Sequence, residues 1–228
     1  MTMPVFRLPD DPIFPPPQLA TEEGLLAVGG DLSPERLLAA YKQGIFPWYS
    51  DGEPILWWSP NPRMVLYPNE FKQSKSFKKT LRRGAYRVSF DTAFEKVIRA
   101  CAALRHESGE RTWITDEMIN AYIKMHALGY AHSVESWYEG QMVGGLYGIA
   151  LGRAFFGESM FSTMSDASKV CLYYLSKFVH EHRFLIIDCQ VPSAHLMRMG
   201  ACNISREDFL TVLKEAQKYP SLNGPWPI

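Results

Sequence analysis

The spacing of hydrophobic residues changes about halfway along the chain. Up to about residue 130, apolar positions recur at the spacing of one helix face. We predict one helix starting at Asp91 and a second starting at Thr115 and ending at Gly129. From His132 onward the pattern is typical of strands separated by tight turns, which predicts a β-meander. Its expected strands are His132–Tyr138, Gln141–Ala150 and Arg153–Phe161.

The remainder of the C-terminal half alternates helices with strands. A helix is expected from about residue 166 to 182, followed by a buried apolar strand at 184–187. A short helix at 193–199, a strand at 201–204 and a final helix opened by a capping box at Ser205 complete the chain. Two helices, a meander and this alternation predict an α+β fold with a mixed β-sheet flanked by helices.

The first 62 residues are rich in proline and aromatic residues. Three consecutive prolines at 15–17 exclude a regular helix or a central strand there. One helix is expected, because Ser33 is a good N-cap, Pro34 suits the first helical position and Gly44 can end the helix. We predict a small N-terminal domain over residues 1–62 and a larger domain over residues 63–228.

The composition is that of an ordinary globular protein. Hydrophobic residues make up 46% of the 228 residues, charged residues make up 21%, and the formal net charge is zero. No apolar stretch approaches the roughly 18 residues that a membrane span requires, and the N-terminus lacks the pattern of a secretory signal. The four cysteines form no C-x-x-C pair, so we expect free thiols, no metal and a cytoplasmic location. The phosphate-binding patterns G-x-x-x-x-G-K-[ST] and G-x-G-x-x-G are also missing, so no nucleotide cofactor is expected.

Basic residues are concentrated between Lys72 and Arg87, a segment without a single acidic residue. One interpretation is a solvated helix face, which is the usual role of such a run. The other is a surface for a polyanion, because the chain as a whole is neutral and these cations gather in one place. Such a surface would give salt-sensitive affinity for a phosphate backbone without reading its sequence. The candidate RNA-binding residues are Lys75, Lys78, Lys79, Arg82 and Arg83.

Two carboxylates occupy apolar surroundings. Glu158 lies within a predicted strand between pairs of hydrophobic residues, and Asp188 ends the apolar run at 184–187. Burying a charge is costly unless it is paired or used. A structural salt bridge, a helix cap and a functional cleft are therefore all open interpretations. Gln190 follows two residues after Asp188, and if the strand continues, both side chains face the same way.

Several long sequence motifs are similar to those of one known family. The chain resembles the bacterial leucyl/phenylalanyl-tRNA–protein transferase family in order from about residue 20 to residue 210. The motifs are GLLAVGGDLSPERLLAAYKQGIFPWYS (24–50), ILWWSPNPR (55–63), RTWIT (111–115), VGGLYG (143–148), FGESMFS (156–162), ASK (167–169) and IDCQV (187–191).

This resemblance implies an enzyme that takes leucine or phenylalanine, and less readily methionine, from aminoacyl-tRNA. It would attach the residue to the N-terminal α-amine of proteins beginning with arginine or lysine, which marks them for degradation. The implied fold is a small N-terminal domain on an acetyltransferase-like (GNAT-like) domain, and the implied state is a monomer without a cofactor. The loop that holds coenzyme A in ordinary acetyltransferases is missing here, which fits an RNA-borne donor. Two alternatives stay open: an acyl-CoA-dependent N-acyltransferase and a non-catalytic RNA-binding module.

The resemblance also implies the site residues. Asp188 and Gln190 match the reactive pair, and Glu158 matches an acidic residue beside it. Leu175 and Val179 stand where phenylalanines are expected, which changes the predicted pocket volume. The implied pocket for the transferred side chain consists of Leu146, Phe155, Met160, Leu172 and Ile187, and the implied ring contacts to the terminal adenosine and the pocket mouth are Tyr41, Trp48, Trp113 and Tyr122.

The expected mechanism needs positioning more than covalent chemistry, because an ester donor and an amide product make the transfer favourable without ATP. The attacking α-amine must be neutral. Our hypothesis is that Gln190 and Asp188 orient this amine and ease its loss of a proton, while backbone N–H groups of the glycine-rich strands hold the oxyanion. A competing hypothesis gives the proton transfer to the 2′-hydroxyl of the tRNA. The negative charge of Glu158 and Asp188 is expected to favour a cationic acceptor.

Overall fold

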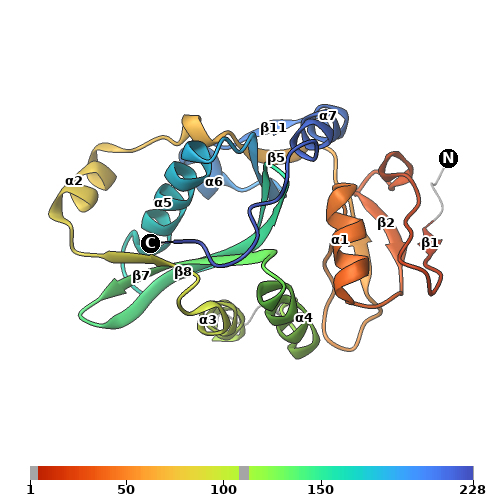
Figure 1. The fold of residues 1–228 in the computed structure, drawn as a ribbon, viewed down its shortest axis with the longest axis horizontal. Coiled ribbons are helices and arrows are strands. Elements are labelled where there is room, and N and C mark those ends of the chain that lie inside the picture. The colour runs from red at the N-terminus through yellow and green to blue at the C-terminus, as the bar shows by residue number, and fades with distance from the viewer. Residues whose placement is uncertain (1–4, 108–112, 228) are drawn as a thin grey trace.

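Two β-sheets of unequal size organise the chain (Figure 1). The computed structural model describes residues 5–107 and 113–227. The smaller sheet has the strand order β1-β2-β4-β3, and all of its strands come from the first 58 residues. Its members are β1 (Phe6–Arg7), β2 (Leu25–Val28), β4 (Leu56–Trp58) and β3 (Phe46–Pro47).

The larger sheet is mixed. Its neighbouring strands are antiparallel except for one parallel pair, β9 with β10, in which Ile187 lies opposite Phe155. This arrangement confirms the predicted α+β class, the mixed sheet and the meander with its tight turn at Glu139-Gly140. In spatial order the strands are β11 (Cys202–Ile204), β5 (Arg63–Leu66), β10 (Ile186–Gln190), β9 (Ala154–Ser162), β8 (Gln141–Leu151), β7 (Ala131–Tyr138) and β6 (Arg87–Phe90).

Helices cover both faces of the larger sheet (Figure 1). The α3 helix (Phe94–Glu107) and α4 (Asp116–Ala127) pack below it in this view, and α5 (Ala167–Glu181) packs above it. Side chains alternate between these layers, as they must along a strand. On β8, Leu146 lies in the apolar cluster beneath α5, whereas Tyr147 lies in the cluster with α3 and α4.

The other helices are shorter. The α1 helix (Pro34–Lys42) starts as predicted, since the Ser33 side chain accepts a hydrogen bond from the Arg36 N–H, and it packs against α4. The strand β3 and this helix belong to the same apolar cluster as β9 and α4, so the smaller sheet is fixed against the larger one by a continuous core. The remaining helices are α2 (Lys75–Arg83), α6 (Ala194–Arg198), α7 (Arg206–Ala216) and the 3₁₀ helices Pro17–Leu19 and Pro68–Glu70.

The prediction that a helix starts at Asp91 is wrong by three residues. Helix α3 starts at Phe94, and Asp91 lies in the connector before it, with a positive φ of 54° and a buried side chain. Its carboxylate accepts a hydrogen bond from the Ser133 N–H and contacts the His132 ring at 2.8 Å. The aspartate therefore fastens the start of the helix to β7. The strand expected at 184–187 is also displaced, because β10 begins at Ile186 and continues to Gln190.

Among the described residues no helix has the length and apolar character that crossing a membrane requires.

Candidate active site

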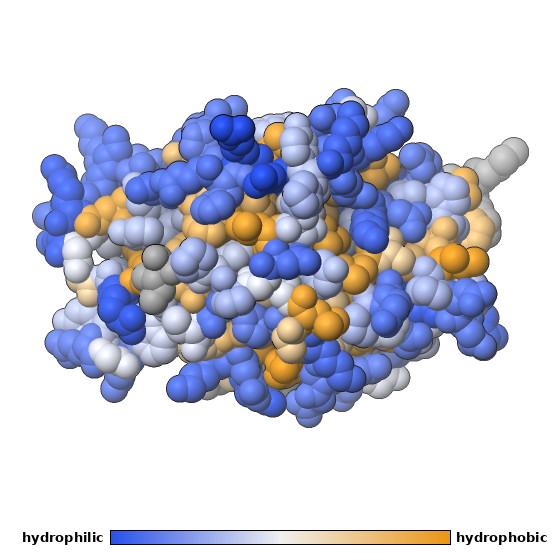
Figure 2. All heavy atoms as spheres, in the orientation of Figure 1, coloured by the Kyte–Doolittle hydropathy of each residue, from blue (hydrophilic) through white to orange (hydrophobic). Residues whose placement is uncertain are grey.

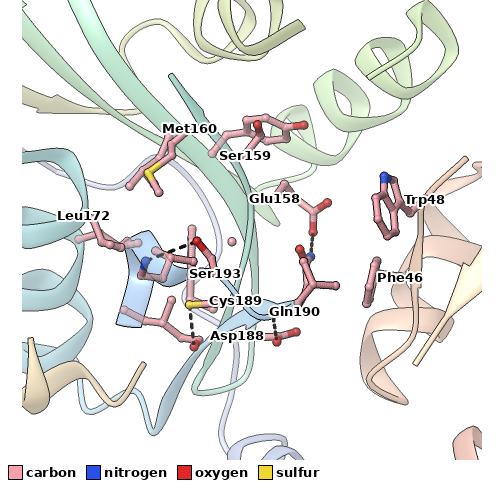
Figure 3. A pocket seen from close by; sticks show the side chains of 18 of the residues that line it. Phe46, Trp48, Glu158, Ser159, Met160, Leu172, Asp188, Cys189, Gln190 and Ser193 are labelled. Carbon is pink, nitrogen blue, oxygen red and sulfur yellow. Dashed lines mark hydrogen bonds between the residues drawn. The ribbon is translucent and has the colours of Figure 1, made fainter. Parts of the chain in front are cut away.

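A cavity of about 300 Å³ lies where the larger sheet meets the smaller one. Strands β8, β9 and β10 form its floor, α5 closes one side, and residues of β3 stand opposite (Figure 3). Most of its surface is apolar, which suits a hydrophobic side chain. All five predicted pocket residues line it, namely Leu146, Phe155, Met160, Leu172 and Ile187.

The two positions that depart from the expected phenylalanines have different surroundings. Leu175 lines the cavity, so its smaller side chain contributes directly to the cavity volume. Val179, one turn further along α5, is buried in the apolar cluster behind the cavity and is not part of its lining. Only the first of these departures can therefore change which side chain fits.

Glu158 lies at the polar end of the cavity and is only 6% exposed. Its Oε1 accepts hydrogen bonds from the Tyr41 hydroxyl at 2.7 Å and from the Gln190 Nε2 at 2.9 Å. Its Oε2 accepts one from the Tyr122 hydroxyl at 3.0 Å. Figure 3 shows Glu158 and Gln190 joined in this way, facing Phe46 and Trp48 across the cleft. None of these direct partners carries a positive charge.

Burial raises the pKa of Glu158 to about 7, and the nearby Asp188 carboxylate adds to this, while the hydrogen bonds from Tyr41, Tyr122 and Gln190 act in the opposite direction. Burial next to Glu158 also raises the pKa of each phenol well above its ordinary value. Both tyrosines thus remain protonated, and Glu158 is the group that exchanges a proton near neutral pH.

Asp188 is held by different chemistry. Arg63 donates to it through two nitrogens, Nε to Oδ1 at 2.8 Å and Nη2 to Oδ2 at 2.6 Å, and both side chains are fully buried. The guanidinium lies between the rings of Phe46 and Phe209, at 4.8 and 4.5 Å from their centres. Such a bidentate, stacked arrangement is specific to arginine. The charge of Asp188 is consequently neutralised inside the protein.

The expectation that Asp188 and Gln190 face the same way is wrong. The register of β10 shifts between these residues, and Gln190 has a positive φ of 63°. Such a bulge re-aims the side chains that follow it. Asp188 therefore points to Arg63 and Gln190 to Glu158. The Asp188 Oδ1 also accepts from the Gln190 backbone N–H at 2.9 Å, which stabilises the bulge.

The four aromatic residues assigned to substrate rings fall into two groups. Trp48 and Trp113 line the cavity, and Trp48 is 43% exposed with its ring 5.8 Å from that of Trp58. Tyr41 and Tyr122 are fully buried, and their hydroxyls contact each other as well as Glu158. Helices α1 and α4 pack these two tyrosines into the core and neither lines the cavity, so their contacts with the terminal adenosine and the pocket mouth stay a prediction.

The basic residues form a separate surface. All five candidate cations lie on α2 and are exposed, while Phe77 on the same helix is buried and packs against Tyr173 of α5. Hydrophilic side chains cover the left end of the molecule, where α2 lies (Figures 1 and 2). A shallow groove between α2 and α5 is lined by Gln73, Lys78, Leu81, Arg82, Tyr173 and Tyr174.

Sequence reasoning missed Arg63, the residue that pairs with Asp188. A signal was available, since a lone arginine begins the apolar strand Arg63–Leu66 and a charge in that setting requires a partner. Its partner lies 125 residues away, so the pairing itself could not be read locally. Further lining residues without a sequence signal are Phe46, Ser159, Cys189, Ser193 and Leu196.

Comparison with known proteins gives matches to one family over most of the chain. Two family models match, described as leucyl/phenylalanyl-tRNA protein transferase over residues 65–214 and as the N-terminal domain of that protein over residues 30–61. A similar protein of the same description, from Desulfatibacillum aliphaticivorans, is 55% identical over 99% of this chain and 97% of its own length. Another, from Syntrophobacter fumaroxidans, is 59% identical over 93% of this chain and 91% of its own length. Among solved structures, a GCN5-related N-acetyltransferase from Kribbella flavida aligns with 79% of this chain and 68% of its own, at 10% identity and a TM-score of 0.39.

Proposed function

The chain belongs to the leucyl/phenylalanyl-tRNA–protein transferase family and is an aminoacyltransferase that moves an aminoacyl group from tRNA to a protein. From this premise we propose that it transfers leucine or phenylalanine, and less readily methionine, to the α-amine of proteins beginning with arginine or lysine. The modified protein is thereby marked for degradation. The observation that carries this proposal is the apolar cavity that ends at Glu158 and Gln190.

The donor side chain occupies the apolar part of the cavity. Leucine and phenylalanine fit walls made of leucine, isoleucine, methionine and phenylalanine, whereas polar side chains would lose their hydration there. A pocket of this kind separates substrates that differ by one methylene by only about 1–3 kcal/mol. Methionine, which is flexible and of similar size, is therefore a slower donor. The indoles of Trp48 and Trp113 at the cavity suit the terminal adenosine of the tRNA.

The acceptor amine binds at the polar end. Gln190 donates one amide hydrogen to Glu158. The Oε1 of Gln190 is then available to accept a hydrogen bond from the amine. Asp188 acts through Gln190, because it holds the bulge that aims this side chain. Glu158, Gln190 and Asp188 together thus form the catalytic centre, with Asp188 as a positioning residue. Proton transfer through the 2′-hydroxyl of the tRNA is the competing route.

Acceptor choice depends on charge. Since Arg63 neutralises Asp188, the negative charge in the centre is that of ionised Glu158. More negative charge surrounds Tyr49, which follows the cavity residue Trp48 in the sequence: its hydroxyl is 3.3 Å from the Glu117 carboxylate, and the charge of Asp51 also acts on it. These groups favour an acceptor that begins with a cationic residue.

The tRNA body lies along α2. Its exposed cations would neutralise phosphates, and Tyr173 and Tyr174 in the adjoining groove offer rings to the same strand. We further propose that residues 1–62 form a domain of their own, that the enzyme acts as a monomer and that it works in the cytoplasm. The break between the two matched family models, between residues 61 and 65, supports the domain boundary.

The test combines purified protein, tRNA charged with radioactive leucine, and peptides that differ only in their first residue. We expect label in peptides beginning with arginine or lysine and none in one beginning with alanine. Replacing Gln190 by alanine should lower the rate at least about 100-fold. The control is Gln141→Ala, which alters an exposed glutamine on β8. Equal labelling of all peptides would overturn the acceptor rule, and labelling of an amine from acyl-CoA in place of charged tRNA would support the acyl-CoA alternative.

A further inference from the structure

Three oxygen-bearing side chains form a closed ring beside the cavity. Tyr41 comes from α1, Tyr122 from α4 and Glu158 from β9. The ring contains three oxygen–oxygen contacts: Tyr41 with Glu158 Oε1, Tyr122 with Glu158 Oε2, and Tyr41 with Tyr122. We call these three residues the oxygen ring.

The number of protons in the oxygen ring decides whether these contacts are hydrogen bonds. Each phenol has one proton to donate, and an ionised carboxylate has none. With Glu158 ionised, two protons serve three contacts, and one pair of oxygens is left without a proton between them. With Glu158 protonated, three protons serve three contacts and every oxygen is satisfied. The geometry therefore offers a position for a third proton, and burial raises the pKa of Glu158 to about 7, so that this proton can be taken up near neutral pH.

Among the residues that the structure describes, no cation contacts the oxygen ring to hold Glu158 ionised. The groups that face it are Gln190 and Asp188 from β10 and Tyr147 from β8, which is near Tyr122. Arg63 of β5 is bound to Asp188 through two nitrogens, so its positive charge is paired with that carboxylate and not with Glu158. The third proton is thus shared among neutral groups and can leave and return near neutral pH.

Asp188 cannot serve as the proton acceptor in the same way. Its side chain is fully buried, Oδ2 accepts from Arg63, and Oδ1 accepts from both Arg63 and the Gln190 backbone. Both carboxylates line the cavity, but the direct partners of Glu158 are two phenols and an amide, none of which carries a charge. Of the two carboxylates, only Glu158 is both open to a substrate and able to change its charge without leaving a buried cation unpaired.

We propose that the oxygen ring is the proton acceptor of the transfer reaction, with Glu158 taking the proton from the acceptor's N-terminal ammonium. This inference rests on the proposed function. Glu158 is the catalytic residue, and Tyr41 and Tyr122 are positioning residues that set its protonation equilibrium.

The ammonium gives one proton to the Glu158 carboxylate, which becomes a carboxylic acid, and the neutral amine attacks the ester carbonyl of the aminoacyl-tRNA. A carbon–nitrogen bond forms and the carbon–oxygen bond to the ribose breaks. The ribose oxygen leaves with a proton from the attacking nitrogen and becomes a hydroxyl group. Glu158 then releases its proton to solvent, so that one proton is liberated for each amide formed.

The experiment measures single-turnover transfer of labelled leucine at a saturating concentration of an arginine-initiated peptide between pH 5.5 and 8.5. The wild-type rate should rise with pH around a midpoint near 7, where Glu158 loses its proton. Glu158→Gln preserves the shape and hydrogen bonds of the side chain but cannot accept a proton. It should lower the rate at least about 100-fold and remove this midpoint. Glu95→Gln, an exposed change on α3, is the matched control and should behave as wild type.

The positioning role has its own readout. Tyr122→Phe removes a hydrogen bond to the ionised carboxylate and should move the midpoint upward by about one pH unit, since bonds to charged groups are stronger than those between neutral groups. Infrared difference spectra between pH 6 and pH 8 should show a carboxylic acid signal in the wild type that is missing in Glu158→Gln. This signal does not depend on turnover.

The outcomes separate this inference from the proposed function. No transfer by the wild-type protein would count against the function itself. Transfer by the wild type, with Glu158→Gln retaining both its rate and the midpoint, would overturn the inference alone. A pH midpoint of Tyr122→Phe equal to that of the wild type would contradict the positioning role of the two phenols.

Discussion

Two buried carboxylates lie on neighbouring strands of one sheet, and the protein stabilises them in opposite ways. Asp188 on β10 has an arginine bound through two nitrogens and held between two aromatic rings. Glu158 on β9 has two phenols and an amide as partners. An ion pair stabilises the ionised form of a carboxylate, whereas neutral hydrogen-bond donors allow the carboxylate to gain and lose a proton. We call Asp188 with Arg63 the first region and Glu158 with its phenols and amide the second region. We infer that the first region sets the geometry of the site and that the second region carries out its proton transfer.

The largest effect is expected from breaking the ion pair. Arg63→Met keeps an unbranched apolar side chain between Phe46 and Phe209 but leaves the Asp188 charge buried without a cation. Removing one partner of a buried pair typically costs about 3–5 kcal/mol, and the free energy of unfolding in urea should fall by that amount. The matched control is Arg99→Met, which breaks the exposed pair with Glu95 and should cost less than about 1 kcal/mol. Equal losses would mean that burial does not distinguish these pairs. Adding Asp188→Leu to the first variant should restore most of the stability.

The second region should reveal itself through the pH dependence of stability. The pKa of Glu158 is about 7 in the folded chain against its ordinary value of 4.5. Between these two pH values the folded state keeps a proton that the unfolded state has lost, so stability falls as pH rises. Below 4.5 and above 7 both states bind equal numbers of protons at this site and the slope vanishes.

The measurement compares wild type with Glu158→Gln across that range. The difference between their unfolding free energies should change by about 3 kcal/mol between pH 4.5 and 7.5, with the wild type losing stability relative to the variant as pH rises. A parallel pair of curves would show that Glu158 is ionised throughout this range, and the contrast between the two regions would disappear.

The apolar wall of the cavity provides a third way to sharpen the comparison, because it should alter donor choice without touching proton transfer. Leu175→Phe fills part of the cavity and should disfavour phenylalanine relative to leucine by roughly 10- to 200-fold, the range that corresponds to about 1–3 kcal/mol. The ratio of kcat/KM values for the two charged tRNAs measures this. Since the substitution adds no charge, the midpoint of the pH profile should stay where it is in the wild type. A shifted midpoint would mean that the apolar wall also controls Glu158.

Much of the larger sheet and of the helices around it could be predicted from local signals. The meander follows from period-two spacing and from the Glu139-Gly140 turn, and α4 follows from the Thr115 cap. The strands of the smaller sheet are two to four residues long and contain no repeat that a pattern could detect. The five pocket residues came from family resemblance, and all five line the cavity.

The polar centre could not be derived locally, because its contacts join distant parts of the chain. Tyr41 is 117 positions from Glu158, and Arg63 is 125 positions from Asp188. The bulge that turns Gln190 away from Asp188 depends on pairing with β5, which the sequence pattern does not report. The sequence identified both carboxylates as unusual, but only the packing of α1, α4 and β5 decides which one is paired with a cation.

The smallest effects per residue are expected on α2, whose cations differ from both carboxylates in being exposed to solvent. Exposed charges are screened by salt, so each contributes modestly to binding a phosphate backbone.

Replacing Lys78 or Arg82 by glutamine should weaken tRNA binding by less than about tenfold and reduce the slope of log affinity against log salt by about one. Lys214→Gln, an exposed change on α7, serves as the control and should leave the slope unchanged. If all three substitutions behave alike, α2 is a solvated helix face and the tRNA lies elsewhere. If only the two on α2 lower the slope, while the pH midpoint of transfer is unaltered, then binding of the RNA and handling of the proton belong to separate regions of the molecule.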